Sequence, residues 1–162
     1  MNRTMYCGEV RSEQVGETIT LSGWVQKRRD LGGMIFVDLR DRAGIVQVVF
    51  NSERSQDAFS IAESIRSEFV VEITGKVVNR QEGTINSELP TGDVEIEAQT
   101  ISILNKAKTP PFDIQDAVEV SDDIRLRYRY LDLRRNKMKE NMIIRHKVKK
   151  VFSDFLDRNG FL

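Results

Sequence analysis

The chain has very little cysteine, histidine or proline: one Cys, one His and three Pro in 162 residues. The single Cys7 excludes an internal disulfide framework and a cysteine-rich metal cluster. The lone His146 stands in a basic stretch, where we expect a surface side chain and not a catalyst. No apolar run is long enough to cross a membrane or to serve as a signal peptide. These absences favour a cytoplasmic protein with no membrane partner.

Neither sign of charge is in excess overall, but the two parts of the chain differ. Residues 1–104 hold 11 Lys or Arg against 16 Asp or Glu, a net charge of −5. Residues 105–162 hold 14 against 9, a net charge of +5. Non-specific affinity for nucleic acid comes from neutralising phosphates. An acidic first part is therefore expected to bind nucleic acid only locally and selectively.

Alternation of apolar and polar residues is the main signal in the first fifty residues. It predicts three strands, with a basic loop between the first two and a tight turn between the next two. These strands span residues 18–27, 34–41 and 44–50.

On the second predicted strand, an aromatic ring lies on the polar side. Ile35, Val37 and Leu39 point one way, so Phe36 points the other way together with Asp38. The neighbouring loop adds three cations: Lys27, Arg28 and Arg29. Rings and guanidinium groups displayed on a sheet are how small β-barrels hold single-stranded bases.

The order of the remaining elements predicts a mainly β fold. A helix is expected over 52–67, a fourth strand over 69–78 with a bulge or a close backbone approach at Gly75, and a fifth strand over 93–98 after an irregular loop. Five strands with one helix between the third and fourth is the order of a five-stranded OB-fold Greek-key barrel.

The run Thr109-Pro-Pro-Phe112 marks a boundary after the barrel, because it continues neither strand nor helix. One helix is expected to open at Ser121, with Leu126, Tyr130 and Leu133 along one face. A second runs from about Lys139 to Asn159 with an apolar stripe. The predicted domains are a barrel, a helical hinge and a C-terminal helix: residues 1–106, 107–138 and 139–162.

Several runs resemble bacterial-type aspartyl-tRNA synthetases, and together they cover essentially the whole chain. They are Tyr6-Cys7-Gly8, Gly23-Trp24-Val25, Ile35-Phe36-Val37-Asp38-Leu39-Arg40-Asp41, Gly44-Ile45-Val46-Gln47-Val48 and Arg127-Tyr128-Arg129-Tyr130-Leu131-Asp132-Leu133-Arg134-Arg135. The last run is shared with the related synthetases for asparagine and lysine.

The resemblance implies that the barrel grips the anticodon loop of tRNA(Asp) and that a hinge leads to a class II catalytic domain. It implies ATP and Mg²⁺ as cofactors of the full-length enzyme, and a homodimer built through motif 1. The helix ending at 159–162 resembles the start of motif 1. The motifs that hold ATP and aspartate would lie beyond residue 162. This chain is therefore expected to have no catalytic or metal-binding residue and no cofactor of its own.

The resemblance also implies roles for residues on the polar face. Phe36 stacks on the middle anticodon base, a uracil, while Gln47 and Arg29 hold the edge of that base. Glu95 reads the first base by accepting hydrogen bonds from a guanine. The contacts to the ends of the anticodon come from Arg80 and Asn86 in the loop after the fourth strand, and Lys27 meets phosphate.

Each role has a purely structural alternative. The Phe36 ring could cover a neighbouring strand, and Gln47 could be a solvated strand residue. Arg29 could form a surface ion pair with Asp30, and Glu95 could be one of several solvated acids. The basic stretch 125–135 is either an RNA-binding helix or, as we favour, a hinge whose arginines pair with acids.

Three other functions compete with anticodon recognition in an aspartate–tRNA ligase. The chain could come from an asparagine-specific relative, or be a free-standing OB module that binds single-stranded nucleic acid. It could also be an interaction domain with no nucleic-acid partner. The net charge of residues 1–104 argues against the second, and a ring on the polar face argues against the third.

Overall fold

The structure is a computed structural model that describes residues 3–162. The chain divides into two compact units, one ending at Pro110 and one spanning Pro111–Leu162. Two consecutive prolines account for a division at this point, because neither can continue a hydrogen-bonded strand. Within the described residues, no helix is both long enough and apolar enough to span a membrane.

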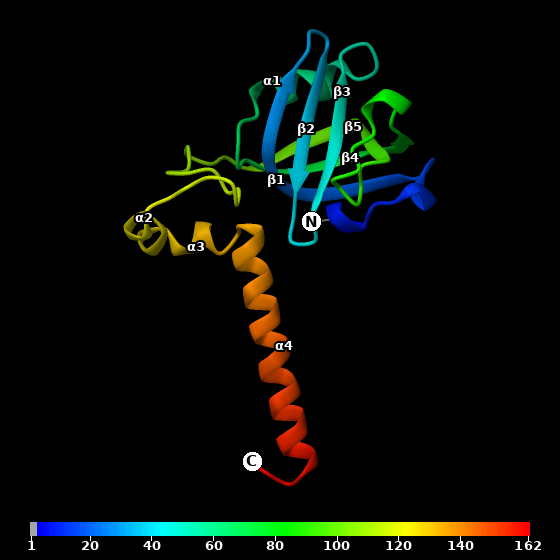
Figure 1. The fold of residues 1–162 in the computed structure, drawn as a ribbon. Helices are drawn as coiled ribbons and strands as arrows, with labels where there is room; N and C mark the ends of the chain where they lie inside the picture. The colour runs from blue at the N-terminus through cyan, green and yellow to red at the C-terminus, as the bar shows by residue number, and fades with distance from the viewer. Residues whose placement is uncertain (1–2) are drawn as a thin grey trace. The chain divides into compact units, whose positions relative to one another are not determined.

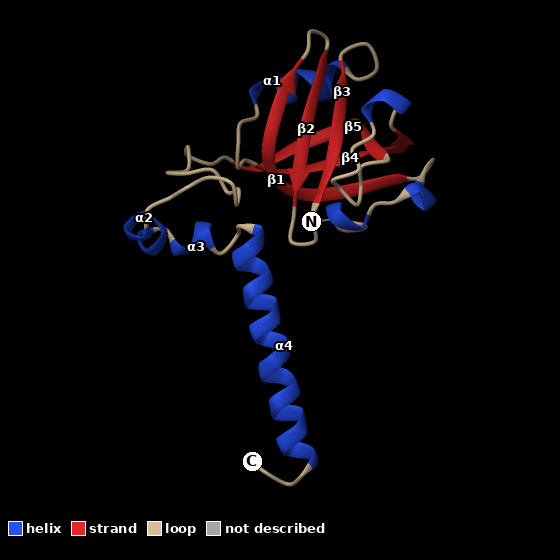
Figure 2. Cartoon of the chain, in the orientation of Figure 1, coloured by secondary structure: helices blue, strands red, loops and turns tan. Residues whose placement is uncertain are grey.

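The first unit is a closed five-stranded barrel (Figures 1 and 2). The strands follow the order β1-β2-β3-β5-β4, and only the β3–β5 pair is parallel. This confirms the predicted OB-fold. Its elements are η1 (Cys7–Glu9), η2 (Ser12–Gln14), β1 (Thr18–Asp30), β2 (Met34–Arg40), β3 (Ile45–Asn51), α1 (Gln56–Ser64), β4 (Val70–Asn79), η3 (Glu82–Thr84) and β5 (Val94–Asn105).

The barrel core forms because alternate residues of each strand are apolar. Ile35, Val37 and Leu39 of β2 are fully buried, as predicted. Helix α1 adds Phe59 and Ala62 to the same cluster, and it lies at the end of the barrel where β1 turns into β2 (Figure 1). The core thus fills the barrel, and the second set of alternating side chains is left on the outer face.

The prediction that β1 ends at residue 27 and is followed by a basic loop is wrong. β1 continues to Asp30 and pairs with β2 beyond a bulge between Val25 and Lys27. The bulge shifts the alternation by one residue, which is why a strict period of two stops predicting this strand. As a result Arg29 lies on the sheet, directly opposite Phe36.

The second unit is helical, with α2 (Asp122–Arg127), α3 (Arg129–Asp132) and α4 (Asn136–Arg158). The single helix predicted from Ser121 is wrong, because Tyr128 has φ −112° and ψ 45° and separates α2 from α3. With this break, Leu126 and Tyr130 are exposed, and Leu131 packs into a small core with Phe112 and Ile114.

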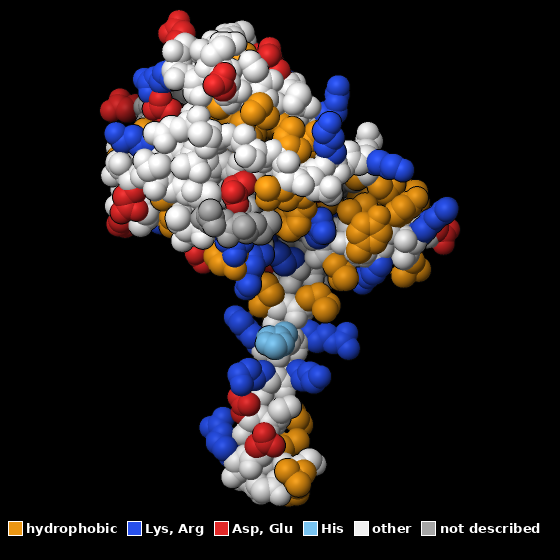
Figure 3. Space-filling view, turned by 180° about the vertical axis from the view of Figure 1, so that it is seen from behind, with side chains coloured by type: hydrophobic (Ala, Val, Ile, Leu, Met, Phe, Trp, Pro, Cys, Tyr) orange, Lys and Arg blue, Asp and Glu red, His pale blue; other side chains and the backbone are white. Residues whose placement is uncertain are grey.

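Helix α4 has no buried residue among those described. Its predicted stripe is exposed, with Ile144, Val148, Phe152 and Phe155 each 59–67% exposed. His146 is exposed as predicted. Lys and Arg side chains surround this helix in Figure 3. The length of α4 therefore owes little to burial within its own unit.

Candidate nucleic-acid interface

The outer face of the barrel brings together polar side chains from four strands. Arg29 comes from β1, Phe36 and Asp38 from β2, Gln47 from β3 and Glu95 from β5. The ladder places Arg29 opposite Phe36, and Asp38 opposite Gln47. The parallel pairing of Val48 with Ile96 brings β5 beside β3. Gln47 and Glu95, which are 48 residues apart in the chain, therefore lie next to each other.

These side chains form one hydrogen-bonded row across the sheet. The Nη2 of Arg29 donates to Asp38 Oδ1 at 2.7 Å and to Gln47 Oε1 at 3.2 Å. The Nε2 of Gln47 donates to Glu95 Oε2 at 2.7 Å. The amide of Gln47 is thus oriented at both ends, with its carbonyl toward a cation and its NH₂ toward an anion. Only 9% of Gln47 is exposed, so the row is held in place by packing as well.

The row can present both donors and acceptors to a base. Glu95 and Arg29 are partly exposed, and each has more hydrogen-bonding capacity than the row uses. A carboxylate has about four acceptor sites and a guanidinium has five N–H donors. Phe36 is half-buried and lies beside Arg29 on the same face. A ring next to fixed donors and acceptors suits an unstacked base that is read along its edge.

Two structural alternatives are wrong. Asp30 pairs with Arg28, whose Nη2 is 2.8 Å from Asp30 Oδ2, so Arg29 is free to join the row. The acids of β5 are not simply solvated either: Glu97 forms an ion pair with Arg54, and Glu95 accepts the bond from Gln47 described above. A covering role for the Phe36 ring is tested by the variants proposed in the Discussion.

The loop between β4 and β5 contains two further predicted residues, and the structure shows both supporting the loop. Arg80 is 8% exposed and donates to the carbonyl oxygens of Val94 at 3.1 Å and Thr84 at 3.3 Å. Burial lowers the pKa of the Arg80 guanidinium, although Glu95 and Asp38 oppose this shift. The Arg80 guanidinium is thus used to hold the backbone of this loop.

Asn86 is held within its own turn, whereas Lys27 lies on β1. The Oδ1 of Asn86 accepts the backbone N–H of Glu88 at 3.0 Å, and its own N–H donates to Gly92 O at 3.1 Å. A Cβ on Gly92 would stand 1.7 Å from the Asn86 carbonyl oxygen, so the turn needs glycine there. Lys27 is exposed and opposite Asp38.

Asp38 belongs to the row, but the sequence did not single it out. It carries the shortest hydrogen bond that Arg29 makes, and it lies on the same outer face as Phe36. That shared face was visible in the alternation of β2. What the sequence could not show was its partner, because the length of β1 was underestimated.

The family comparison decides what kind of barrel this is. Residues 19–104 match the family described as "OB-fold nucleic acid binding domain". The chain belongs to this OB-fold family. A second family, "tRNA synthetases class II (D, K and N)", matches residues 121–162. The helical unit of this OB-fold protein is therefore similar to a different family from the barrel.

The OB-fold chain is similar along its length to curated ligases. It is 62% identical over 161 residues to "Aspartate--tRNA ligase" of Bacillus licheniformis, covering 99% of this chain and 27% of the relative. It is 60% identical to "Aspartate--tRNA(Asp/Asn) ligase" of Bacillus subtilis over the same shares. The chain thus spans about a quarter of the length of these relatives.

Solved structures agree with this similarity. An aspartyl-tRNA synthetase from Entamoeba histolytica gives a TM-score of 0.86 at 25% identity, over 96% of this chain and 37% of the other. An asparaginyl-tRNA synthetase from Pyrococcus horikoshii gives 0.82 at 25% identity, over 99% and 36%. An OBody bound to hen egg-white lysozyme gives 0.58 at 29% identity, over 66% and 97%.

The helical unit of this OB-fold chain contains a basic cluster around one buried acid. Asp132 is fully buried and its carboxylate pairs with three arginines: Arg125 at 3.0 Å, Arg129 at 2.6 Å and Arg135 at 3.6 Å. The predicted pairing of the hinge arginines with acids is confirmed.

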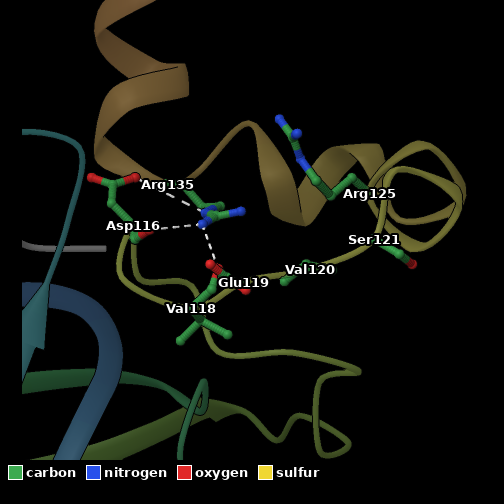
Figure 4. Close-up of a pocket in the computed structure, with 7 residues that line it drawn as sticks. All are labelled: Asp116, Val118, Glu119, Val120, Ser121, Arg125 and Arg135. Carbon is green, nitrogen blue, oxygen red and sulfur yellow. Dashed lines mark hydrogen bonds and ion pairs between the residues drawn. The ribbon is translucent and has the colours of Figure 1, made fainter.

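A hollow of about 500 Å³ lies beside this cluster and is lined by Arg125 and Arg135 (Figure 4). Arg135 also donates to the carbonyl oxygens of Asp116 at 3.0 Å and Val118 at 2.7 Å. The guanidinium groups at this hollow are therefore engaged within their own unit. Arg125 and Arg135 therefore have few N–H donors left for a phosphate in this hollow.

The cluster makes this unit sensitive to acid. Burial raises the pKa of Asp132, but the hydrogen bond and charge of Arg125 and the charges of the other two arginines outweigh it, so the pKa is lowered. A carboxyl with a lowered folded pKa contributes stability above its unfolded pKa of about 4, and this is lost as the pH falls through the folded pKa.

We expect the helical unit of the parent chain to loosen as the pH is lowered from about 5 toward the folded pKa of Asp132. The methyl signals of Leu131, which is buried in this unit, would report the change by NMR. Asp132→Asn should weaken the unit at neutral pH and flatten its acid response. An equally steep acid response in Asp132→Asn would contradict the assignment to Asp132.

Proposed function

We propose that this chain recognises the anticodon loop of tRNA(Asp) as part of an aspartate–tRNA ligase. The observation that carries the proposal is the hydrogen-bonded row of Arg29, Asp38, Gln47 and Glu95 beside Phe36, on the outer face of an OB barrel. Two further findings support it: the family match of the barrel and the identity to aspartate–tRNA ligases.

In this proposal the row exchanges its internal hydrogen bonds for bonds to bases. The Phe36 ring stacks on the middle uracil, whose edge has acceptors for Arg29 and both kinds of group for Gln47. Glu95 accepts the two adjacent N–H donors of a guanine at the first position. Arg80 and Asn86 hold the neighbouring loop against the end of the anticodon, and Lys27 meets a phosphate.

The proposal is tested by binding of the 162-residue chain to an anticodon stem-loop that carries GUC. Fluorescence anisotropy would compare this RNA with single-base variants at each anticodon position. We expect discrimination of about 1–3 kcal/mol at the first and middle positions. Equal affinity for all loops would overturn base recognition and leave a general single-strand binder or a protein-interaction module.

Glu95→Gln should relax the choice of the first base. An amide presents one acceptor where the carboxylate presents two, and Gln47 already uses one acceptor at this position. The parent chain should therefore prefer guanine to inosine, which lacks the N2 amino group, by about 1–3 kcal/mol, and the variant should lose most of that preference. Glu97→Gln, two residues along β5, is the matched control. A variant that keeps the full preference for guanine would remove Glu95 from base recognition.

The third anticodon base distinguishes the two tRNA specificities that the names of the relatives describe. "Aspartate--tRNA ligase" and "Aspartate--tRNA(Asp/Asn) ligase" both occur among proteins more than 50% identical to this chain. A stem-loop ending in U in place of C tests which specificity this barrel has. Leu31, which is 70% exposed at the tip between β1 and β2, is the side chain we would vary first.

The remaining properties follow from membership of a class II ligase. In this proposal residues 1–106 bind the anticodon, 107–138 form a hinge and 139–162 begin the catalytic domain, which uses ATP and Mg²⁺ in the cytoplasm. Among residues 3–162 no group of three or more His, Cys, Asp or Glu could hold a metal ion, and in this proposal Mg²⁺ is held elsewhere in the ligase, together with the ATP phosphates. A second copy of the enzyme would cover the exposed apolar stripe of α4.

A further inference from the structure

The outer face of β2 continues past the candidate interface toward a cluster of aromatic and basic residues. Asp38 is followed on the same face by Arg40, which lies opposite Trp24 of β1. The guanidinium carbon of Arg40 is 5.9 Å from the centre of the Trp24 ring. A hollow of about 180 Å³ beside Trp24 is also lined by Arg3 and Arg42. Arg40 itself is buried, so the exposed Arg3 and Arg42 are the cations of this hollow that an outside ligand can reach.

Arg3 and Arg42 are held by stacking rather than by ion pairing. Their guanidinium carbons lie 3.9 Å and 5.3 Å from the centre of the Tyr6 ring. Both side chains are exposed, and within residues 3–162 neither makes a hydrogen bond or an ion pair. Two like charges gathered on one ring repel each other, so an anion placed between or beside them would be favoured.

The two arginines outnumber the one acid of this hollow. Asp41 also lines the hollow and carries a negative charge, so the three groups together carry a net charge of +1. The Asp41 carboxylate is directed at backbone N–H groups, those of Cys7 at 2.6 Å, Ala43 at 2.8 Å and Gly44 at 3.1 Å. The bond from Cys7 ties the N-terminal segment to the turn between β2 and β3, and Figure 1 draws that segment beside the turn. Arg3 of the segment and Arg42 of the turn thereby reach the same ring. The positions of the two charges are therefore built into the fold.

We infer that Arg3 and Arg42 bind backbone phosphates of the same RNA whose bases are read at Phe36, at the junction of its loop and stem. This inference rests on the proposed function. Six residues separate Phe36 from Arg42, at most about 20 Å along a strand, which corresponds to a few nucleotides of RNA. In the first unit the charges of Arg29 and Arg40 are already paired with acids, so these two uncommitted charges supply affinity where the row supplies selectivity.

The test compares the double variant Arg3→Gln/Arg42→Gln with the control Arg66→Gln/Lys76→Gln, which removes two exposed charges elsewhere on the barrel. Binding of the GUC stem-loop would be measured between about 50 and 200 mM salt. Each lost phosphate contact lowers the slope of log affinity against log salt by about 0.7–0.9. The gap in affinity between parent and double variant should therefore narrow roughly tenfold over this range, with base discrimination unchanged.

Two further measurements separate charge from folding. Arg3→Lys/Arg42→Lys keeps both charges and should keep most of the salt slope. A single-stranded RNA with the loop sequence but no stem should bind the double variant and the parent almost equally. If the parent discriminates between loops but the double variant has the same slope as the control, the phosphate contact is wrong while the proposed function stands. If the parent binds no stem-loop, both fail.

Discussion

Phe36→Ala is expected to weaken binding of the GUC stem-loop by about 1–3 kcal/mol, the usual value of one base stacked on an aromatic ring. The ring is half-buried on the outer face, beside Arg29 and opposite Val49. Alanine leaves the neighbouring hydrogen-bonded row in place but removes the ring on which the proposal stacks the middle base. The loss should be largest for RNA with the correct middle base, because in the proposal that base also gains the bonds to the row.

Controls separate stacking from packing at this position. Phe36→Leu keeps apolar contact with the neighbouring strand but cannot stack, whereas Phe36→Trp keeps a ring. We expect the leucine variant to resemble Phe36→Ala in RNA binding and the parent in stability, measured by urea unfolding. Glu63→Ala, an exposed change on α1, sets the background. If Phe36→Ala weakens binding no more than Glu63→Ala, the recognition face lies elsewhere on the barrel.

Glu68→Gln is expected to destabilise the barrel by about 3–5 kcal/mol, because it leaves a buried arginine without its counter-charge. The Nη2 of Arg40 donates to both carboxylate oxygens of Glu68, at 3.0 and 2.8 Å. The two side chains are only 9% and 10% exposed. The Nη1 of Arg40 has no hydrogen-bond partner among the described residues, so the remaining charge depends heavily on this one carboxylate.

A second substitution identifies the cause of the loss. Arg40→Met/Glu68→Leu replaces both charges by apolar side chains, and we expect it to recover most of the stability, since a buried pair is often replaceable by apolar groups. Glu68→Gly removes the same carboxylate but relieves the backbone, because Glu68 has φ +64°, a conformation that glycine adopts more readily. A smaller loss of stability than in Glu68→Gln would measure that relief. Fluorescence of Trp24, the only tryptophan, reports the unfolding of the barrel. A loss equal in the single and double variants would show that charge is not the cause.

The local sequence was sufficient to predict those elements that keep one buried face and one outer face along their whole length. The alternation of Ile35, Val37 and Leu39 was enough to assign the two faces of β2, because side chains of a strand point to opposite sides in turn. Gly75 was predicted to mark a bulge or a close approach, and the structure shows the close approach: a Cβ there would stand 2.4 Å from the carbonyl oxygen of Glu97 on the neighbouring β5, next to the shift in register between the two strands. The five strands and one helix then left the OB-fold as the matching order.

The extents of elements were set by pairing that the sequence does not display. β5 runs to Asn105, well beyond the predicted strand, because its second half pairs with the start of β4 across the irregularity at Gly75. β1 reaches Asp30 because it regains β2 after its bulge. The break at Tyr128 follows from tertiary packing too, since it places Leu131 in a core with Phe112 and Ile114.

The sequence by itself determined what chemistry the candidate side chains carry. Strand alternation placed Phe36, Gln47 and Glu95 on an outer face, whereas the family resemblance singled out Arg29 at the edge of an expected loop. Only the tertiary structure decided which of them meet. The parallel β3–β5 pairing closes the barrel and puts Glu95 against Gln47, and the extended β1 puts Arg29 against Asp38. Contacts between residues far apart in the chain depend on register and closure, which no local pattern specifies.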